Sequence, residues 1–203
     1  MEANMLNIHL IILAAGNSKR FGSNKLLYKI NNIPMYQHVI DMIKLAEEKE
    51  KLFTKKIVVT KYPEVISAFE NLKDYEIALN YKSDDGQSSS IKAGLEKSLC
   101  YEKPNAWCFM VCDQPYLNSN TLRNFIKAWE NQSLGIGSLG FGSRRGNPNI
   151  FSNAYEKELM SLLGDTGGRS IINTHLDDVF MYSVQNKEEL LDIDEICDII
   201  KSF

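Results

Sequence analysis

The feature that most constrains the fold is an alternation of short apolar runs with longer amphipathic segments. The apolar runs are residues 9–13, 56–60, 76–80 and 107–111. Such runs are typical of strands buried on both faces of a sheet. The expected helices are residues 35–49, 64–72, 88–99 and 121–129, the last capped by Asn118 or Ser119. The alternation predicts an α/β fold of the three-layer α/β/α sandwich type, with a mostly parallel sheet.

The second half of the chain has a looser pattern. Five glycines lie close together after residue 129, at positions 135, 137, 140, 142 and 146, and they predict shorter strands and loops. Residues 193–202 predict a closing helix. With 203 residues, 44% of them hydrophobic, we expect residues 1–203 to form a single domain.

Charge and composition exclude several classes of protein. A formal net charge of −3 argues against a nucleic-acid-binding surface, so a bound phosphate has to be held by a local site. The first apolar run is too short to span a bilayer, and no basic leader precedes it, so no membrane association is expected. The four cysteines include no CxxC pair and indicate reduced thiols in a cytoplasmic protein.

The segment that follows the first apolar run combines small residues with cations. It reads LAAGNSKRFGSNK, from Leu13 to Lys25. Small residues let the backbone approach a ligand closely and turn its amides toward phosphate oxygens. The spacing matches neither the P-loop nor the GxGxxG dinucleotide fingerprint. The composition therefore favours a different triphosphate cradle, with a basic solvated turn as the alternative.

Two more polar segments follow expected strands. Residues 85–95 contain Gly86 and three consecutive serines at the start of an expected helix, where free amides and hydroxyls favour anion binding or an ordinary helix cap. Asp113 follows the last apolar run, and Pro115 then turns the chain. Parallel strands bind ligands at their carboxyl ends, so these segments are expected to meet the 13–25 segment.

The 13–25 segment resembles the signature LAAGxSxRFGxxK of nucleotidyltransferases with the Rossmann-like nucleotide-diphospho-sugar transferase fold. More narrowly, the chain resembles the molybdenum cofactor cytidylyltransferase branch. Residues 85–95, residues 112–115, and the loops 146–151 and 164–169 resemble further segments of that family in the same order. The resemblance therefore covers nearly the whole chain and implies this fold.

The resemblance implies a role for each motif. The residues implied in nucleotide binding are Leu13, Ala14, Ala15, Gly16, Ser18, Gly86, Ser89 and Ser90. Those implied in acceptor binding are Asn147, Pro148, Asp165 and Arg169, and Arg144 and Arg145 are further candidates to pair with the acceptor's phosphate. The residues implied in catalysis are Lys25, Arg20 and Asp113.

The family's Asp before x-Pro holds Mg²⁺, which implies Asp113 as a metal ligand. Since Mg²⁺ normally takes one or two carboxylates together with substrate phosphates, a second acid is expected. Asp192 and Asp194 are the candidates, and Asp194 is preferred. The family usually continues Thr-Pro-Glu-Asp where this chain has residues 195–198 as Glu-Ile-Cys-Asp, which leaves open which carboxylate is the ligand. The alternative role for both is to cap the last helix.

The implied reaction transfers CMP from CTP to the phosphate of molybdenum-loaded molybdopterin and releases pyrophosphate. Because a phosphate monoester is already ionised at pH 7, no general base is required, and the scattered positions of His9, His38 and His175 are no obstacle. We expect Lys25 to stabilise charge at the α-phosphate, and Arg20 with the amides of residues 15–18 to hold the pyrophosphate.

Three alternatives remain. They are a guanylyltransferase for the same pterin, a CTP or UTP transferase for a sugar or polyol phosphate, and a non-enzymatic accessory protein that delivers cofactor to a molybdenum enzyme. Guanylyl enzymes usually have Gly where this chain has Ala15, whose methyl narrows the base slot and favours CTP over GTP. A molybdenum hydroxylase is a candidate partner enzyme.

Overall fold

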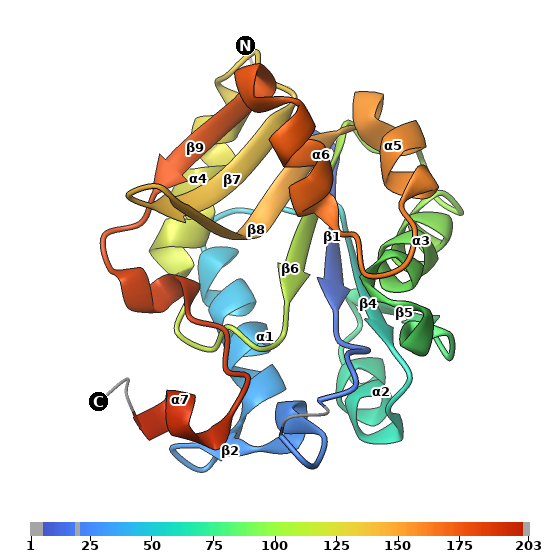
Figure 1. Ribbon diagram of the computed structural model, residues 1–203, viewed down its shortest axis with the longest axis vertical. Helices are drawn as coiled ribbons and strands as arrows, with labels where there is room; N and C mark the ends of the chain where they lie inside the picture. The colour runs from blue at the N-terminus through green and yellow to red at the C-terminus, as the bar shows by residue number, and fades with distance from the viewer. Residues whose placement is uncertain (1–5, 19–20, 201–203) are drawn as a thin grey trace.

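A seven-stranded sheet forms the centre of the computed structural model, which describes residues 6–18 and 21–200 (Figure 1). The strand order is β5-β4-β1-β6-β8-β7-β9. The strands are β1 (Ile8–Leu13), β4 (Lys55–Thr60), β5 (Tyr75–Leu79), β6 (Ala106–Val111), β7 (Ile136–Phe141), β8 (Arg144–Ser152) and β9 (Val179–Ser183). Only β8 runs opposite to its neighbours within this sheet. A separate two-stranded sheet joins β2 (Lys29–Ile30) to β3 (Ile33–Pro34).

Helices cover both faces of the sheet. They are α1 (Met35–Ala46), α2 (Pro63–Glu70), α3 (Gln87–Ser98), α4 (Ser119–Glu130), α5 (Glu156–Ser161), α6 (Gly168–Thr174) and α7 (Ile196–Ile200). Helices α1, α2 and α4 pack in the hydrophobic cluster that contains Leu10, and α3, α5 and α6 pack in the cluster that contains Ile11. Because successive strand residues face opposite sides of a sheet, these two clusters are its two faces. The three-layer α/β/α prediction is confirmed.

The centre of the sheet sets the position of the candidate site. Leu13, the last residue of β1, pairs with Val59 of β4 and with Val111 of β6, so the segments that follow the three strands begin at the same level. In Figure 1 the arrowheads of β1, β4 and β6 point toward the lower half of the molecule, where α7 also lies. The strand order reverses beside β1, and ligands of open α/β sheets bind at such a switch point.

The strands predicted in the first half of the chain are present, whereas helix ends and the second half of the chain differ from the predictions. Each of the four predicted strands is present with its start within one residue, whereas α1 ends at Ala46 rather than at residue 49, and α7 begins at Ile196 rather than at residue 193. The expectation of shorter strands after residue 129 is wrong, because β8 has nine residues and is the longest strand of the described chain.

Gly142 lies in the turn between β7 and β8 with φ +59°, but Gly137, Gly140 and Gly146 lie inside strands. These three make room for neighbouring side chains, as glycine in a strand often does. A Cβ added to Gly137 would lie 2.8 Å from the Trp129 ring, and one added to Gly140 would lie 2.8 Å from the sulfur of Met181. No helix in the described residues is long and apolar enough to cross a membrane.

Candidate functional site

A cavity of about 490 Å³ lies where the segments after β1 and β6 meet the start of α3. Eleven of the residues predicted from the sequence line it: Leu13, Ala14, Ala15, Gly16, Ser18, Lys25, Gly86, Ser90, Asp113, Asp165 and Asp194. We call this space the first cavity. Gly16 is exposed, and a Cβ added to it would meet nothing within 4 Å, so the glycine leaves open space on the cavity wall.

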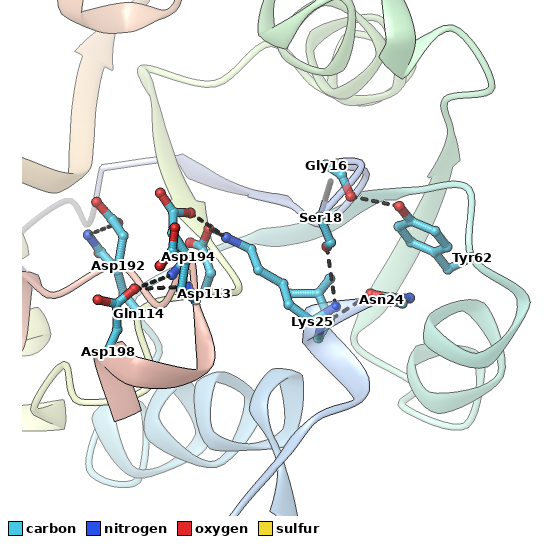
Figure 2. Close-up of polar contacts among 12 residues, drawn as sticks. Gly16, Ser18, Asn24, Lys25, Tyr62, Asp113, Gln114, Asp192, Asp194 and Asp198 are labelled. Atoms are coloured by element: carbon cyan, nitrogen blue, oxygen red, sulfur yellow. Dashed lines mark hydrogen bonds and ion pairs between the residues drawn. The ribbon is translucent and has the colours of Figure 1, made fainter. Parts of the chain in front are cut away.

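Lys25 joins the loop after β1 to two carboxylates (Figure 2). Its backbone N–H donates to Ser18 Oγ at 3.2 Å, and it begins a short 3-10 helix, Lys25–Leu27, capped by Asn24. Its Nζ lies 2.7 Å from Asp113 Oδ2 and 2.9 Å from Asp194 Oδ1. The Lys25 side chain is 11% exposed, so a single largely buried ammonium connects three segments that are far apart in the sequence.

The carboxylates keep this ammonium charged. Burial lowers the pKa of Lys25, but the charges and hydrogen bonds of Asp113 and Asp194 outweigh burial, and the pKa is raised above its ordinary value of 10.5. Burial, followed by the nearby charge of Asp113, raises the pKa of Asp192 above its ordinary value of 3.8. The site therefore combines a permanent cation with several acidic groups.

The last segment separates the two acids of the Leu-Asp-Ile-Asp sequence. Its backbone is fixed to the end of β6, where Ile193 N–H donates to Asp113 O at 2.9 Å. Asp194 lines the first cavity, whereas Asp192 is not among its lining residues and accepts from Gln114 Nε2 at 2.8 Å. The start of α7 is capped by Asp198, whose Oδ2 accepts from the N–H groups of residues 194 and 195 at 3.1 and 2.8 Å. Asp198 thus provides the reverse cap of this helix.

The serines at the start of α3 are oriented differently from one another. Ser90 lines the first cavity and accepts from Asn80 Nδ2 at 2.9 Å. Ser89 lies outside that lining, and its hydroxyl donates to Gly86 O at 2.8 Å. Gly86 has φ +100°, and a Cβ there would lie 2.3 Å from the backbone carbon of Gly164. Both observations require glycine at position 86.

A second cavity of about 300 Å³ adjoins the first. Its predicted acceptor residues are Asn147, Asp165 and Arg169, while Pro148 is buried and does not line it. Arg145 also lines this cavity, and Arg144 does not. The apolar part of the lining consists of Leu13, Ile91, Phe109, Phe151, Leu159 and Ile172. Three residues line both cavities, so the two spaces lie side by side.

Comparison with known proteins shows the family of this chain. Residues 10–179 match the model of the MobA-like NTP transferase domain. The chain belongs to this family. The nucleotidyltransferase assignment predicted from the LAAGNSKRFGSNK segment is thereby confirmed, and the choice between a cytidylyl and a guanylyl enzyme is not decided by it.

The individual relatives agree with this family. A stretch of 62 residues is 40% identical to the probable molybdenum cofactor guanylyltransferase of Thermococcus sibiricus (strain DSM 12597 / MM 739), over 30% of this chain and 29% of that protein. The match thus spans less than a third of that relative's length.

Solved structures show that the fold is shared. Rv0371c from Mycobacterium tuberculosis H37Rv has a TM-score of 0.79 at 22% identity, with 98% of each chain covered. A nucleotidyl transferase from Methanothermobacter thermautotroptrophicus has a TM-score of 0.77 at 19% identity, over 98% of this chain and 96% of that chain.

The acids beside Lys25 fit the Mg²⁺ site that the sequence predicts. Asp113 Oδ1 is buried and has no hydrogen-bond partner in the described structure, so one oxygen of this carboxylate is not used by Lys25. The described residues contain no group of three or more His, Cys, Asp or Glu side chains arranged to hold a metal. Two carboxylates nevertheless suffice for Mg²⁺ when substrate phosphates supply further oxygens.

The structure also identifies residues near the first cavity that sequence reasoning missed. Asn17 Nδ2 donates to Asp84 Oδ1 at 2.6 Å, and Lys61 Nζ donates to Asn17 Oδ1 at 2.5 Å. Tyr62 OH donates to Gly16 O at 2.6 Å and holds the glycine in place. Lys61 and Tyr62 directly follow the strand predicted over residues 56–60, and this position at the carboxyl end of a parallel strand could have indicated a place near the site. Arg20, predicted to be catalytic, lies outside the described residues.

Proposed function

We propose that this chain transfers CMP from CTP to the phosphate of molybdenum-loaded molybdopterin and releases pyrophosphate. The observation that carries the proposal is the Lys25 ammonium, held by Asp113 and Asp194 on the wall of the cavity formed by the loop after β1. An oxygen of the acceptor phosphate attacks the α-phosphorus of CTP, and the bond from that phosphorus to the β-phosphate oxygen breaks. Pyrophosphate leaves with the bonding electron pair.

Charge neutralisation and alignment are the main tasks of such a site. The second pKa of a phosphate monoester is about 6, so the acceptor is mostly dianionic at neutral pH. No histidine is among the described lining residues of either cavity, in agreement with a reaction that needs no general base. Lys25 stabilises the negative charge that develops at the α-phosphate, and the small residues from Ala14 to Gly16 let backbone amides approach the phosphates.

Asp113 and Asp194 are the proposed ligands of Mg²⁺, with Asp192 as the nearby acid that does not line the cavity. When bound, Mg²⁺ would neutralise phosphate charge. The structure of Rv0371c has also been determined as a complex with manganese, which supports a divalent ion in this fold and leaves its identity here to be measured.

CTP is the proposed nucleotide because of Ala15, which is 1% exposed and lines the first cavity. Its methyl group narrows the space for a purine. GTP is the second candidate, because the relative from Thermococcus sibiricus is named a probable molybdenum cofactor guanylyltransferase. A steric difference of one methyl is worth about 1–3 kcal/mol, so Ala15→Gly should raise the turnover of GTP relative to CTP by about tenfold or more.

The second cavity supports a flat heterocyclic acceptor. Phe109 and Phe151 lie edge to face in its lining, with ring centroids 6.0 Å apart, and such surfaces favour planar rings over the hydroxyl-rich face of a polyol. Arg145 and Arg169 provide cations for the acceptor's phosphate. A molybdenum hydroxylase remains the proposed recipient of the product. The cysteines are free, with Cys100 and Cys197 exposed, which supports the proposed cytoplasmic location.

The test combines purified protein and Mg²⁺ with each of the four NTPs in turn. Molybdenum-loaded molybdopterin and sugar phosphates serve as acceptors, and pyrophosphate release and the mass of the product are measured. We expect turnover with CTP and the pterin. Equal turnover of CTP and GTP would overturn the base assignment. Binding of CTP without turnover of any acceptor would favour the accessory role.

A further inference from the structure

The two cavities meet at three shared residues, Leu13, Gln87 and Asp165. If the proposed function holds, the acceptor phosphate has to reach the α-phosphate at this junction. Leu13 is apolar, and the carboxylate of Asp165 repels a phosphate. Gln87 is the neutral polar side chain among the three, and its amide can donate to a phosphate oxygen without bringing further charge.

The position of Gln87 is set by the two loops that meet at the junction. Gln87 is the first residue of α3 and follows Gly86, whose backbone lies directly against that of Gly164. Ser88 N–H donates to Gly164 O at 3.1 Å. A Cβ added to Gly167 would lie only 2.1 Å from Gln87 Oε1, so the amide rests on the glycine of the acceptor loop.

The hydrogen-bonding capacity of this amide is not used by the described residues of the protein. Within residues 6–18 and 21–200, no hydrogen bond joins the Gln87 side chain to another residue. By contrast, Gln114 donates to Asp192, and Gln132 donates to Ala128 O. Gln87 is exposed and lines both cavities, and its amide packs against Gly167 without a hydrogen bond. This amide is therefore suited to contact a substrate.

We propose that Gln87 is a specificity residue for the acceptor: its Nε2 donates to a non-bridging oxygen of the acceptor phosphate and holds that phosphate in line with the α-phosphate of the bound nucleotide. The inference rests on the proposed function for the identity of the substrates. Gln87 takes no proton and forms no covalent bond, since the attacking oxygen is already ionised. Its contribution is alignment of two anions that repel each other.

The decisive variant is Gln87→Glu, which keeps the shape, removes the donor and adds a negative charge. A glutamate in the first turn of a helix favours folding, so loss of function through unfolding is not expected. Gln132→Glu makes the same chemical change two residues beyond the end of α4, outside the lining of both cavities, and serves as the matched control. A hydrogen bond to a charged group is worth a factor of about 10–100, which is the expected loss of acceptor affinity in Gln87→Glu.

Binding is measured by calorimetry on protein loaded with the α,β-methylene analogue of CTP, using a pterin phosphate and the same pterin without its phosphate. We expect Gln87→Glu to weaken binding of the phosphorylated pterin while leaving affinity for the other pterin and for the CTP analogue within about twofold. Unchanged affinity for the pterin phosphate, or an equal loss for all three ligands, would overturn the inference. This readout does not depend on turnover, whereas absence of pyrophosphate release by the unaltered protein would count against the proposed function alone.

A double-mutant cycle adds a second test. Gly167→Ala should displace the Gln87 amide and weaken binding of the pterin phosphate, since the backbone of Gly167, with φ −122°, admits alanine. In a Gln87→Ala background, Gly167→Ala should change the affinity for the pterin phosphate little, because the Gln87 side chain that the added methyl group would displace is absent. An equally large effect in both backgrounds would show that residue 167 acts without Gln87 and would contradict the proposal.

Discussion

Replacing Lys25 with methionine removes the ammonium group and keeps most of the aliphatic side chain. Asp113 Oδ2 and Asp194 Oδ1 then lose a cation that lies 2.7 and 2.9 Å away. Breaking a fully buried ion pair by removing one partner costs about 3–5 kcal/mol. Since Asp113 is 22% and Asp194 is 40% exposed, water compensates for part of this loss. We expect the free energy of unfolding to fall by about 2 kcal/mol, or the Tm by about 4–8 °C in a domain of this size.

The effect of Lys25→Met on catalysis should be larger than its effect on stability. The ammonium is held in place before substrate binds and acts mainly on charge that develops in the transition state. Loss of one such preorganised group lowers kcat by a factor of about 10²–10³. The affinity for CTP should change much less, because the other residues of the loop after β1 are unaltered. Pyrophosphate release at saturating CTP and acceptor measures kcat, and calorimetry measures the affinity.

The matched control is Lys97→Met, which breaks a surface ion pair. Lys97 Nζ lies 3.3 Å from Glu76 Oε2, and the two side chains are 32% and 41% exposed. This variant should lose less than about 1 kcal/mol of stability and keep its kcat. If folded Lys25→Met retains a kcat within about threefold of the unaltered protein, the ammonium is only structural and the proposed chemistry is wrong.

Three further predictions concern the metal, the loop after β1 and the buried histidine. Asp113→Asn should weaken Mn²⁺ binding, measured by electron paramagnetic resonance, by about tenfold or more; unchanged Mn²⁺ affinity would exclude this carboxylate as a ligand. Gly16→Ala should leave the Tm unchanged, because a Cβ meets nothing within 4 Å, but weaken CTP binding by intruding on the cavity; normal CTP affinity would show that the ligand does not approach this wall. His9 is 1% exposed, and burial together with the charge of Lys55 lowers its pKa from 6.5 to about 4. His9 therefore becomes protonated below pH 6.5 in the unfolded chain but only near pH 4 in the folded chain. Protonation thus favours the unfolded state, and lowering the pH from 7 to 5 should reduce the free energy of unfolding by about 2 kcal/mol through His9. Denaturant unfolding of the unaltered protein and of His9→Asn at both pH values measures this difference, and an equal pH dependence in both would refute the assignment.

The first half of the fold and the core of the candidate site could be predicted because their signals are local. Runs such as residues 9–13 and 107–111 bury both faces of a strand, so their composition alone identifies them. The motifs that follow these runs sit at the carboxyl ends of parallel strands, where the sheet brings Gly16 and Asp113 to one cavity. The glycines after residue 129 were misleading, because a glycine that gives room to Trp129 looks the same in sequence as one that ends a strand.

The sequence by itself determined the family, the layer order of the fold and the residue types of the site, since each follows from periodicity or from motifs of consecutive residues. Only the tertiary structure decided which of Asp192 and Asp194 lies on the cavity, and that Asp198 caps the last helix. It also decided that Gln87 lines both of the adjacent cavities. These outcomes depend on contacts between segments as distant as Lys25 and Asp194, and the direction of a side chain at such a contact is set by packing of the whole chain rather than by its sequence neighbours.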